Sequence, residues 1–314
     1  MLWIVDFKLL SVLQNLGRSN LVYLSYKHAV HYKVDNHDRS IKSDIQIPRI
    51  MQVHTARNMG NHIRINKIHS FLTQRNAQHC PYYHHATRSG QVVQDMIGDY
   101  SGYLQTDGYS AYNSAVNAVR VGCWAHARRK FTDCIPKGVK TDDTRASEAL
   151  ELIGRIFAAD EGLVELPSEE RQEQRQIILK PLLDEYWDFI ESIYAASGSG
   201  IAKAVTYSIN QKAYLNNVLL SGDLELTNNL AERAIKPFVI GRKNWLFSDT
   251  DKGADASARC YSIIESESRN DLNVFGYLSY LLTELPKLGE DPTDKQLDDL
   301  MPWSEALPGY CKNV

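Results

Sequence analysis

The sequence has no apolar run of about 20 residues, which is the length that a helix needs to cross a membrane. Its apolar residues 1–10 also lack the basic start and the cleavage site of an export signal. The five cysteines are odd in number and scattered, as is usual in a reducing cytosol: Cys80, Cys123, Cys134, Cys260 and Cys311. We therefore expect a cytoplasmic protein without a membrane-spanning segment.

Glutamate is absent from residues 1–90, which contain 12 Lys and Arg and 4 Asp, whereas residues 91–314 have a net charge of −11. Residues 54–69 and 74–85 show neither the helical nor the strand period. One interpretation is a basic, histidine-rich arm that binds nucleic acid or metal. The favoured interpretation is that residues 1–82 are a poorly ordered segment translated from a shifted frame or from unrelated DNA, because evolved basic arms are richer in Gly, Ser or Lys.

The most informative segment, residues 227–237, has the sequence Thr-Asn-Asn-Leu-Ala-Glu-Arg-Ala-Ile-Lys-Pro. Asn228 or Asn229 can cap the first turn of a helix. Helical spacing places four polar residues on one face: Asn229, Glu232, Arg233 and Lys236. A carboxylate flanked by cations suits a metal ion and a phosphodiester. The alternative is a solvated face with one ion pair between Glu232 and Lys236.

A second segment, Gly-Tyr-Leu-Gln-Thr-Asp-Gly-Tyr at residues 102–109, is typical of a short strand that ends in an acid and a turn. Gly108 allows the chain to turn sharply after Asp107. An acid at the carboxyl end of a strand points into the crevice where open α/β sheets bind ligands. The apolar stripe at residues 92–97 predicts a helix before this strand, and residues 109–116 and 119–123 predict a helix and a strand after it. The alternative is that Asp107 only caps the following helix.

A third segment, Gly-Cys-Trp-Ala-His-Ala-Arg-Arg-Lys-Phe at residues 122–131, places a dense cationic cluster at the start of a helix that follows a strand. Arg128, Arg129 and Lys130 can contact phosphates, which gives affinity without sequence readout. The alternative is a solvated face.

Together, these three segments resemble the blocks of the insertion-sequence 66 transposases, and the resemblance covers roughly residues 83–308. It implies a ribonuclease H-like α/β fold with a mixed sheet, and a metal-dependent DNA strand-transferase that uses an Asp-Asp-Glu triad. Asp107 resembles the second acid and Glu232 the third, and both are implied as catalytic residues and as ligands of Mg²⁺ or Mn²⁺. DNA contacts are assigned to the cations of these blocks: Arg128, Arg129, Lys130, Arg233, Lys236, Arg242 and Lys243. The family also implies a homo-oligomer on DNA.

The first acid of the triad is missing from the pattern, because no Asp-Glu-Thr-like motif precedes Asp107. The acids available upstream are Asp6, Asp35, Asp38, Asp44, Asp95 and Asp99, and none has matching surroundings. We therefore expect an incomplete sheet and a degenerate transposase without strand cleavage. Two alternatives are an intact transposase with an unrecognised first acid, and a catalytically inactive DNA-binding or interaction protein derived from a transposase.

The long interval between Asp107 and Glu232 predicts a helical insertion at about residues 140–221. One apolar helix stripe consists of Leu150, Ile153, Ile156 and Phe157. A second, aromatic stripe at residues 182–194 follows an expected break at Pro181. We expect the aromatic stripe to be part of the core rather than a platform on which bases stack. The expected domains are a catalytic core at residues 83–260 and a C-terminal helix and tail element at residues 261–314.

Cys123 and His126 have a spacing that suits a metal ion, and with Cys80 and His84 they can form a Cys2His2 zinc site. The favoured alternative is that Cys123 is a small buried side chain and that His126 orients a group near the active site.

Overall fold

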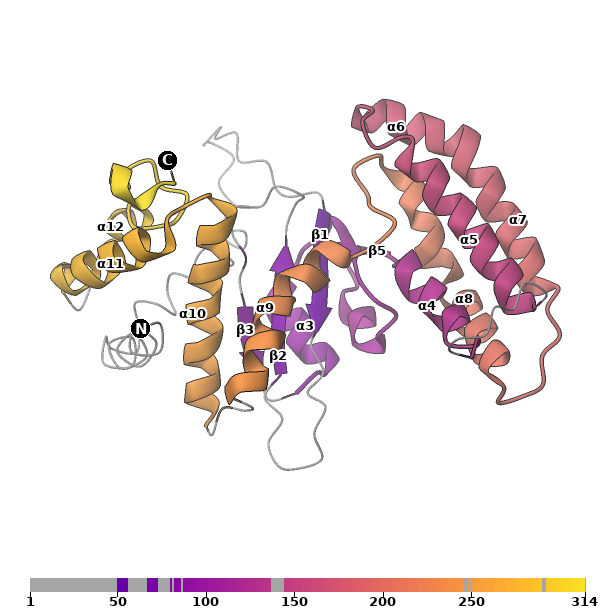
Figure 1. Ribbon diagram of the computed structural model, residues 1–314, viewed down its shortest axis with the longest axis horizontal. Coiled ribbons are helices and arrows are strands. Elements are labelled where there is room, and N and C mark those ends of the chain that lie inside the picture. The colour runs from indigo at the N-terminus through magenta and orange to yellow at the C-terminus, as the bar shows by residue number, and fades with distance from the viewer. Residues whose placement is uncertain are drawn as a thin grey trace. The chain divides into compact units, whose positions relative to one another are not determined.

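The computed structural model describes residues 50–55, 67–72, 80, 82–85, 87–136, 144–245, 248, 250–289 and 292–313 (Figure 1). The chain divides into two compact units. The central unit consists of Ile50–Val53 and Ser101–Leu230. The C-terminal unit consists of the described residues of His54–Tyr100 and Ala231–Val314.

A small parallel sheet lies in the central unit. Its strands are β1 (Ile50–Thr55, which starts in this unit), β4 (Tyr103–Gln105) and β5 (Val119–Val121). β1 pairs with β4 in the register Gln52↔Gln105, and β4 pairs with β5 in the register Gln105↔Val121. The short 3-10 helix η2 (Ser110–Ser114) connects β4 to β5. The expected order of strand, acid, helical turn and strand is therefore present.

Helices form most of the central unit, and the interval that was expected to be a helical insertion consists of helices from residue 145 to residue 220. They are α4 (Trp124–Thr132), α5 (Arg145–Glu161), α6 (Ser168–Gln174), the π-helical turn η3 (Arg175–Leu179), α7 (Lys180–Glu191), α8 (Gly200–Asn216) and the 3-10 turn η4 (Asn217–Leu220). The expected break at Pro181 does not occur. Pro181 lies in the first turn of α7 directly after η3, where a proline is tolerated.

Aromatic side chains fill the core of the central unit. Trp124 of α4 packs edge-on against Tyr186 of α7 with ring centroids 5.1 Å apart, and Tyr186 packs against Trp187 at 4.8 Å. The α5 stripe joins them, because Ile153 and Ile156 are fully buried in the same cluster. Most of the aromatic stripe is therefore core, as expected, although Tyr194 at its end is exposed.

The C-terminal unit contains the antiparallel strands β2 (Lys67–Leu72) and β3 (Tyr82–His85), which pair in the register Ile68↔His84. Both β1 and β2 fall inside residues 1–82, where the sequence shows no clear period. The helices of this unit are α3 (Gly90–Ile97), α9 (Asn229–Trp245, whose first two residues belong to the central unit), α10 (Asp251–Arg269), α11 (Val274–Glu284), η5 (Leu285–Leu288), α12 (Asp294–Asp298) and η6 (Gly309–Cys311).

Small residues let α10 approach β3 closely. The Oγ atom of Ser262 accepts a hydrogen bond from the backbone N–H of Tyr82 (2.7 Å), and the Oγ atom of Ser266 accepts one from that of Cys80 (2.9 Å). The Tyr82 hydroxyl donates to the backbone carbonyl of Ala234 in α9. α9 and α10 are therefore both fixed to the buried Tyr82.

The structure is mostly helical with a small parallel sheet, which is compatible with the expected α/β class. Among the described helices, none combines the length and the apolar character that crossing a bilayer requires.

Candidate functional site

Asp107 lies two residues beyond β4 and is half-buried. Its Oδ1 atom accepts a hydrogen bond from the backbone N–H of Tyr109 at 3.0 Å, which is an Asx turn. A Cβ atom on Gly108 would lie 2.8 Å from the Tyr207 ring, so α8 leaves no room for a side chain there. Gly108 is not among the glycines with positive φ. The chain bends at Gly108, as the sequence indicated, but without a positive φ, so it is the close approach of Tyr207 that favours a residue without a side chain here.

Arg120 of β5 places a buried cation beside the Asp107 backbone. Its guanidinium donates to the side chain of Asn113, to the Thr106 hydroxyl (3.4 Å) and to the Asp107 carbonyl (3.5 Å). It also lies 4.1 Å from the centroid of the Tyr214 ring. Burial lowers the pKa of Arg120, and the interactions with Tyr214 and Asp107 oppose this shift. Sequence analysis missed this residue, although an arginine between two valines of a buried strand is a signal.

His126 lies in the first half of α4 and is half-buried. Burial lowers its pKa below the ordinary value of 6.5; the charges of Arg129 and Lys130 lower it further, and Asp107 opposes the shift. Burial therefore favours the neutral imidazole. Cys123 is buried, as expected for a small apolar group.

Arg128 and Arg129 line an open pocket of about 330 Å³, which we call the arginine pocket. The pocket is lined by Ala125, Arg128, Arg129, Thr132, Phe157, Thr227 and Asn229. The Arg128 guanidinium lies 5.9 Å from the centroid of the Phe157 ring. Two exposed cations therefore line one hollow, together with residues whose side chains carry hydrogen-bonding groups.

The sequence indicated that the cationic cluster lies at the start of its helix, but the structure places it further along. α4 begins at Trp124, so Arg129 and Lys130 fall in its last turn, where cations favour the negative end of the helix dipole. Lys130 does not line the arginine pocket; its ammonium lies 5.4 Å from the centroid of the Tyr207 ring. The three cations therefore have separate surroundings.

α9 carries Glu232 in its first turn. The expected two faces are present: Ala231, Ala234 and Ile235 are buried, whereas Arg233 and Lys236 are exposed. Glu232 itself is half-buried. Pro237 lies inside α9 without ending it. The backbone of Arg242 and Lys243 continues the helix, but their side chains lie outside the described part of the chain.

The predicted acids and cations fall into two groups. Asp107 and the 128–130 cluster belong to the central unit, and Glu232, Arg233 and Lys236 belong to the C-terminal unit. The upstream acids at positions 6, 35, 38 and 44 lie outside the described residues. Asp99 is exposed, and the exposed Asp95 accepts a hydrogen bond from Gln91 on α3 (2.8 Å).

The strand beside β4 carries no acid, because β1 has the sequence Ile-Met-Gln-Val-His-Thr. Within the described ranges, no three His, Cys, Asp or Glu side chains lie close enough together to hold a metal ion. The zinc alternative is therefore not supported there; His84 instead contacts Asp255 through its Nδ1 atom at 3.1 Å.

Comparisons with known proteins agree with the motifs. Residues 55–256 match a family model described as "Transposase IS66 family". Protein y4hP of Sinorhizobium fredii is 30% identical over 240 residues, which are 71% of this chain and 43% of y4hP. Protein y4qI of the same organism is 29% identical over 228 residues, which are 69% of this chain and 41% of y4qI. Both are described as uncharacterized, and this chain spans less than half the length of each. No solved structure matches.

Proposed function

Because this chain belongs to the IS66 transposase family, we propose that it is a DNA-binding transposase polypeptide whose strand-cleavage site lacks one acid. The proposed catalytic fold is ribonuclease H-like, with Asp107 and Glu232 in the positions of the second and third acids. Parallel pairing of β1, β4 and β5, and an acid two residues beyond the end of β4, support this assignment.

The proposed loss of DNA cleavage is supported mainly by the sequence of β1. Two-metal cleavage of a phosphodiester requires carboxylates that hold two divalent ions about 4 Å apart. Asp107 follows β4, but the sequence of β1, one of the two strands that pair with β4, contains no Asp or Glu. Mg²⁺ keeps several waters and is usually held by one or two carboxylates with substrate phosphates. Two acids can therefore hold one ion, but they lack the further carboxylate that would bridge a pair of ions. The described residues therefore do not fit a complete two-metal site, and no cleavage step is assigned to them.

DNA binding is the activity that the exposed cations support. Arg128 and Arg129 face the arginine pocket together, and arginine binds phosphate oxygens through its fork of N–H groups. Asn229, the first residue of α9, also lines the pocket, and helix N-termini favour anions. These features support a contact with the DNA backbone that does not depend on base sequence.

A salt titration tests this proposal. We expect the affinity for a DNA duplex, measured by fluorescence anisotropy, to fall steeply between about 50 and 200 mM salt. Arg128→Ala and Arg129→Ala should each weaken binding and reduce the slope of log K against log salt by about 1. Lys203→Ala, which removes an exposed cation of α8, is the matched control for net charge. Equal affinities and slopes for the pocket variants and this control would exclude the arginine pocket as the DNA contact.

A further inference from the structure

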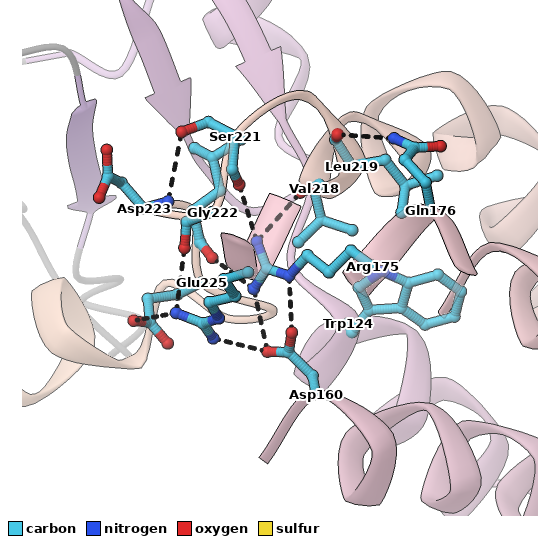
Figure 2. Close-up of polar contacts among 12 residues, drawn as sticks. Trp124, Asp160, Arg175, Gln176, Val218, Leu219, Ser221, Gly222, Asp223 and Glu225 are labelled. Carbon is cyan, nitrogen blue, oxygen red and sulfur yellow. Dashed lines mark hydrogen bonds and ion pairs between the residues drawn. The ribbon is translucent and has the colours of Figure 1, made fainter. Parts of the chain in front are cut away.

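The segment that joins the helices of the central unit to α9 is held by side chains of α6 and η3. Helix C-termini leave their last carbonyl groups without partners inside the helix. Here α8 ends in η4, and carbonyls in and after η4 accept hydrogen bonds from long side chains instead. Gln176 donates to the carbonyl of Leu219 at 3.0 Å, and Gln172 donates to that of Leu220 at 2.9 Å. Figure 2 shows the first of these bonds.

Arg175 lies at the centre of this arrangement and is completely buried. Its Nη1 atom donates to the carbonyls of Val218 (3.1 Å) and Ser221 (2.8 Å), and its Nη2 atom donates to that of Leu224 (2.7 Å). The Nε and Nη2 atoms also donate to the Asp160 carboxylate at 2.7 and 3.0 Å (Figure 2). All five N–H groups of the guanidinium therefore have acceptors, three of them in residues 218–224.

Arg171 adds a second cation to the same carboxylate. Its guanidinium donates to Asp160 at 2.8 Å and to the carbonyl of Gly222 at 3.1 Å. The Glu225 carboxylate lies 3.8 Å from Arg171, so two cations are balanced by two anions. We call Asp160, Arg171 and Arg175 the loop clamp. A buried ion pair is by itself weak evidence of stabilisation, but this one also holds four backbone carbonyls of the following segment.

The same segment is fixed to the sheet and to α4. The Gln105 side chain, two residues before Asp107, donates to the carbonyl of Glu225. The backbone N–H of Trp124 donates to the carbonyl of Leu226 at 2.8 Å. Gly222 has no space for a side chain, because a Cβ atom there would lie 1.9 Å from the carbonyl oxygen of Ser168. α9 then begins at Asn229, three residues after Leu226.

We infer that the loop clamp is a positioning device, which fixes residues 218–226, the segment that leads into α9, within the unit that carries Asp107. This inference rests on the proposed function, in which Glu232 has the position of the third acid. Asp160 and the two arginines touch no substrate; they act through residues 218–226. A clamp that only stabilises the helices would affect α5 and α7 as much as this segment.

Hydrogen-exchange mass spectrometry on the full chain distinguishes these two roles. Arg175→Lys keeps the positive charge but cannot reach the carbonyls of residues 218–224 and Asp160 together. Arg155→Lys is the matched control, because Arg155 forms a bidentate pair with Glu185 between α5 and α7 (2.6 and 2.8 Å) and holds no carbonyl. Exchange is compared for peptides that cover residues 217–236, α5 and α7.

We expect Arg175→Lys to accelerate exchange in residues 217–236 by about tenfold while α5 and α7 exchange as in the wild type. Arg155→Lys should leave residues 217–236 unchanged. If Arg175→Lys does not fold, Arg171→Lys replaces it as the test variant. This variant loses the hydrogen bond to the Gly222 carbonyl and part of the ion pair with Asp160, so exchange in residues 217–236 should accelerate by a smaller factor. Unchanged exchange in residues 217–236, or an equal increase in α5 and α7, would overturn the inference.

The exchange measurement uses neither DNA nor metal, so its outcome is separate from that of the proposed function. A wild-type chain that fails to bind DNA would refute the proposed function and leave the local exchange result standing. Normal DNA binding with unaltered exchange in Arg175→Lys would refute the clamp alone.

Discussion

Glu267 is a buried carboxylate in the described part of the C-terminal unit, and replacing it should change how the stability of this unit depends on pH. It lies in α10, its side chain is completely buried, and neither carboxylate oxygen has a hydrogen-bond partner. Burial, with a contribution from Glu265, raises the pKa of Glu267 from 4.5 to about 7. The folded protein therefore holds a proton on Glu267 at pH values where the unfolded chain has lost it.

The sign of the pH dependence follows from proton linkage. Between about pH 4.5 and pH 7 the unfolded chain binds fewer protons at this position than the folded chain, so stability falls as the pH rises. The stability that protonated Glu267 contributes is fully present below pH 4.5 and is lost as the pH rises through about 7. At about 1.4 kcal/mol per pKa unit, the full effect is about 3 kcal/mol.

Glu267→Gln removes the titration while keeping the shape of the side chain. We expect its effect on the free energy of unfolding, relative to the wild type, to become about 3 kcal/mol more stabilising from pH 4.5 to pH 8. Comparing the two pH values removes the cost of burying the amide, because that cost is the same at both. Urea unfolding read by hydrogen exchange in α10 and α11 measures it for this unit. Glu305→Gln, an exposed carboxylate of the same unit, is the control. The same shift for both variants, or none for Glu267→Gln, would refute the buried-carboxylate argument.

Two further substitutions test the packing around the site. Gly108→Ala should destabilise the central unit by about 1–3 kcal/mol, because its Cβ atom would lie 2.8 Å from the Tyr207 ring; equal stability in urea unfolding would contradict this contact. Asp160→Asn should cost about 3–5 kcal/mol, because it removes the carboxylate that two buried guanidiniums share, whereas Glu185→Gln, in an exposed pair, should cost less than about 1 kcal/mol. Similar losses in thermal unfolding for these two variants would argue against the buried network.

The sequence predicts the elements whose side chains follow a clear period. The α9 faces follow from the spacing of Ala231, Ala234 and Ile235, which are buried as the pattern requires. The apolar stripe of α5 was predicted for the same reason, and its residues Ile153 and Ile156 lie in the core. Long amphipathic helices are the elements that hydrophobic period identifies best.

α10 was not predicted because its buried face is made of small and polar residues. Ala254, Ala258, Ser262 and Ser266 recur every four residues and are buried, but none of them reads as apolar core in a hydropathy pattern. Their small size, rather than their hydrophobicity, suits the close approach to β3. The strands β1 and β2 were missed because six residues without a clear alternation contain too little pattern to separate them from loops.

The loop clamp could not be found from sequence, because its members gain meaning only through tertiary contacts. Asp160, Arg171 and Arg175 lie in a charged stretch that looks like a solvated helix face. Their burial depends on the packing of the α5 C-terminus against α6 and η3. The position of Asp107 was predictable, by contrast, because a strand followed by an acid and a glycine is a local signal.

A plasmid-nicking assay tests the central claim most directly, namely that this transposase-family chain binds DNA but lacks a complete cleavage site. Supercoiled DNA is incubated with the full chain and Mg²⁺ or Mn²⁺ under conditions in which binding has been verified by anisotropy, with Asp107→Asn and Glu232→Gln in parallel. The account predicts bound DNA that stays supercoiled in all three samples. Nicking that depends on Mg²⁺ or Mn²⁺ and disappears in both variants would contradict it, because a third acid would then have to complete the site.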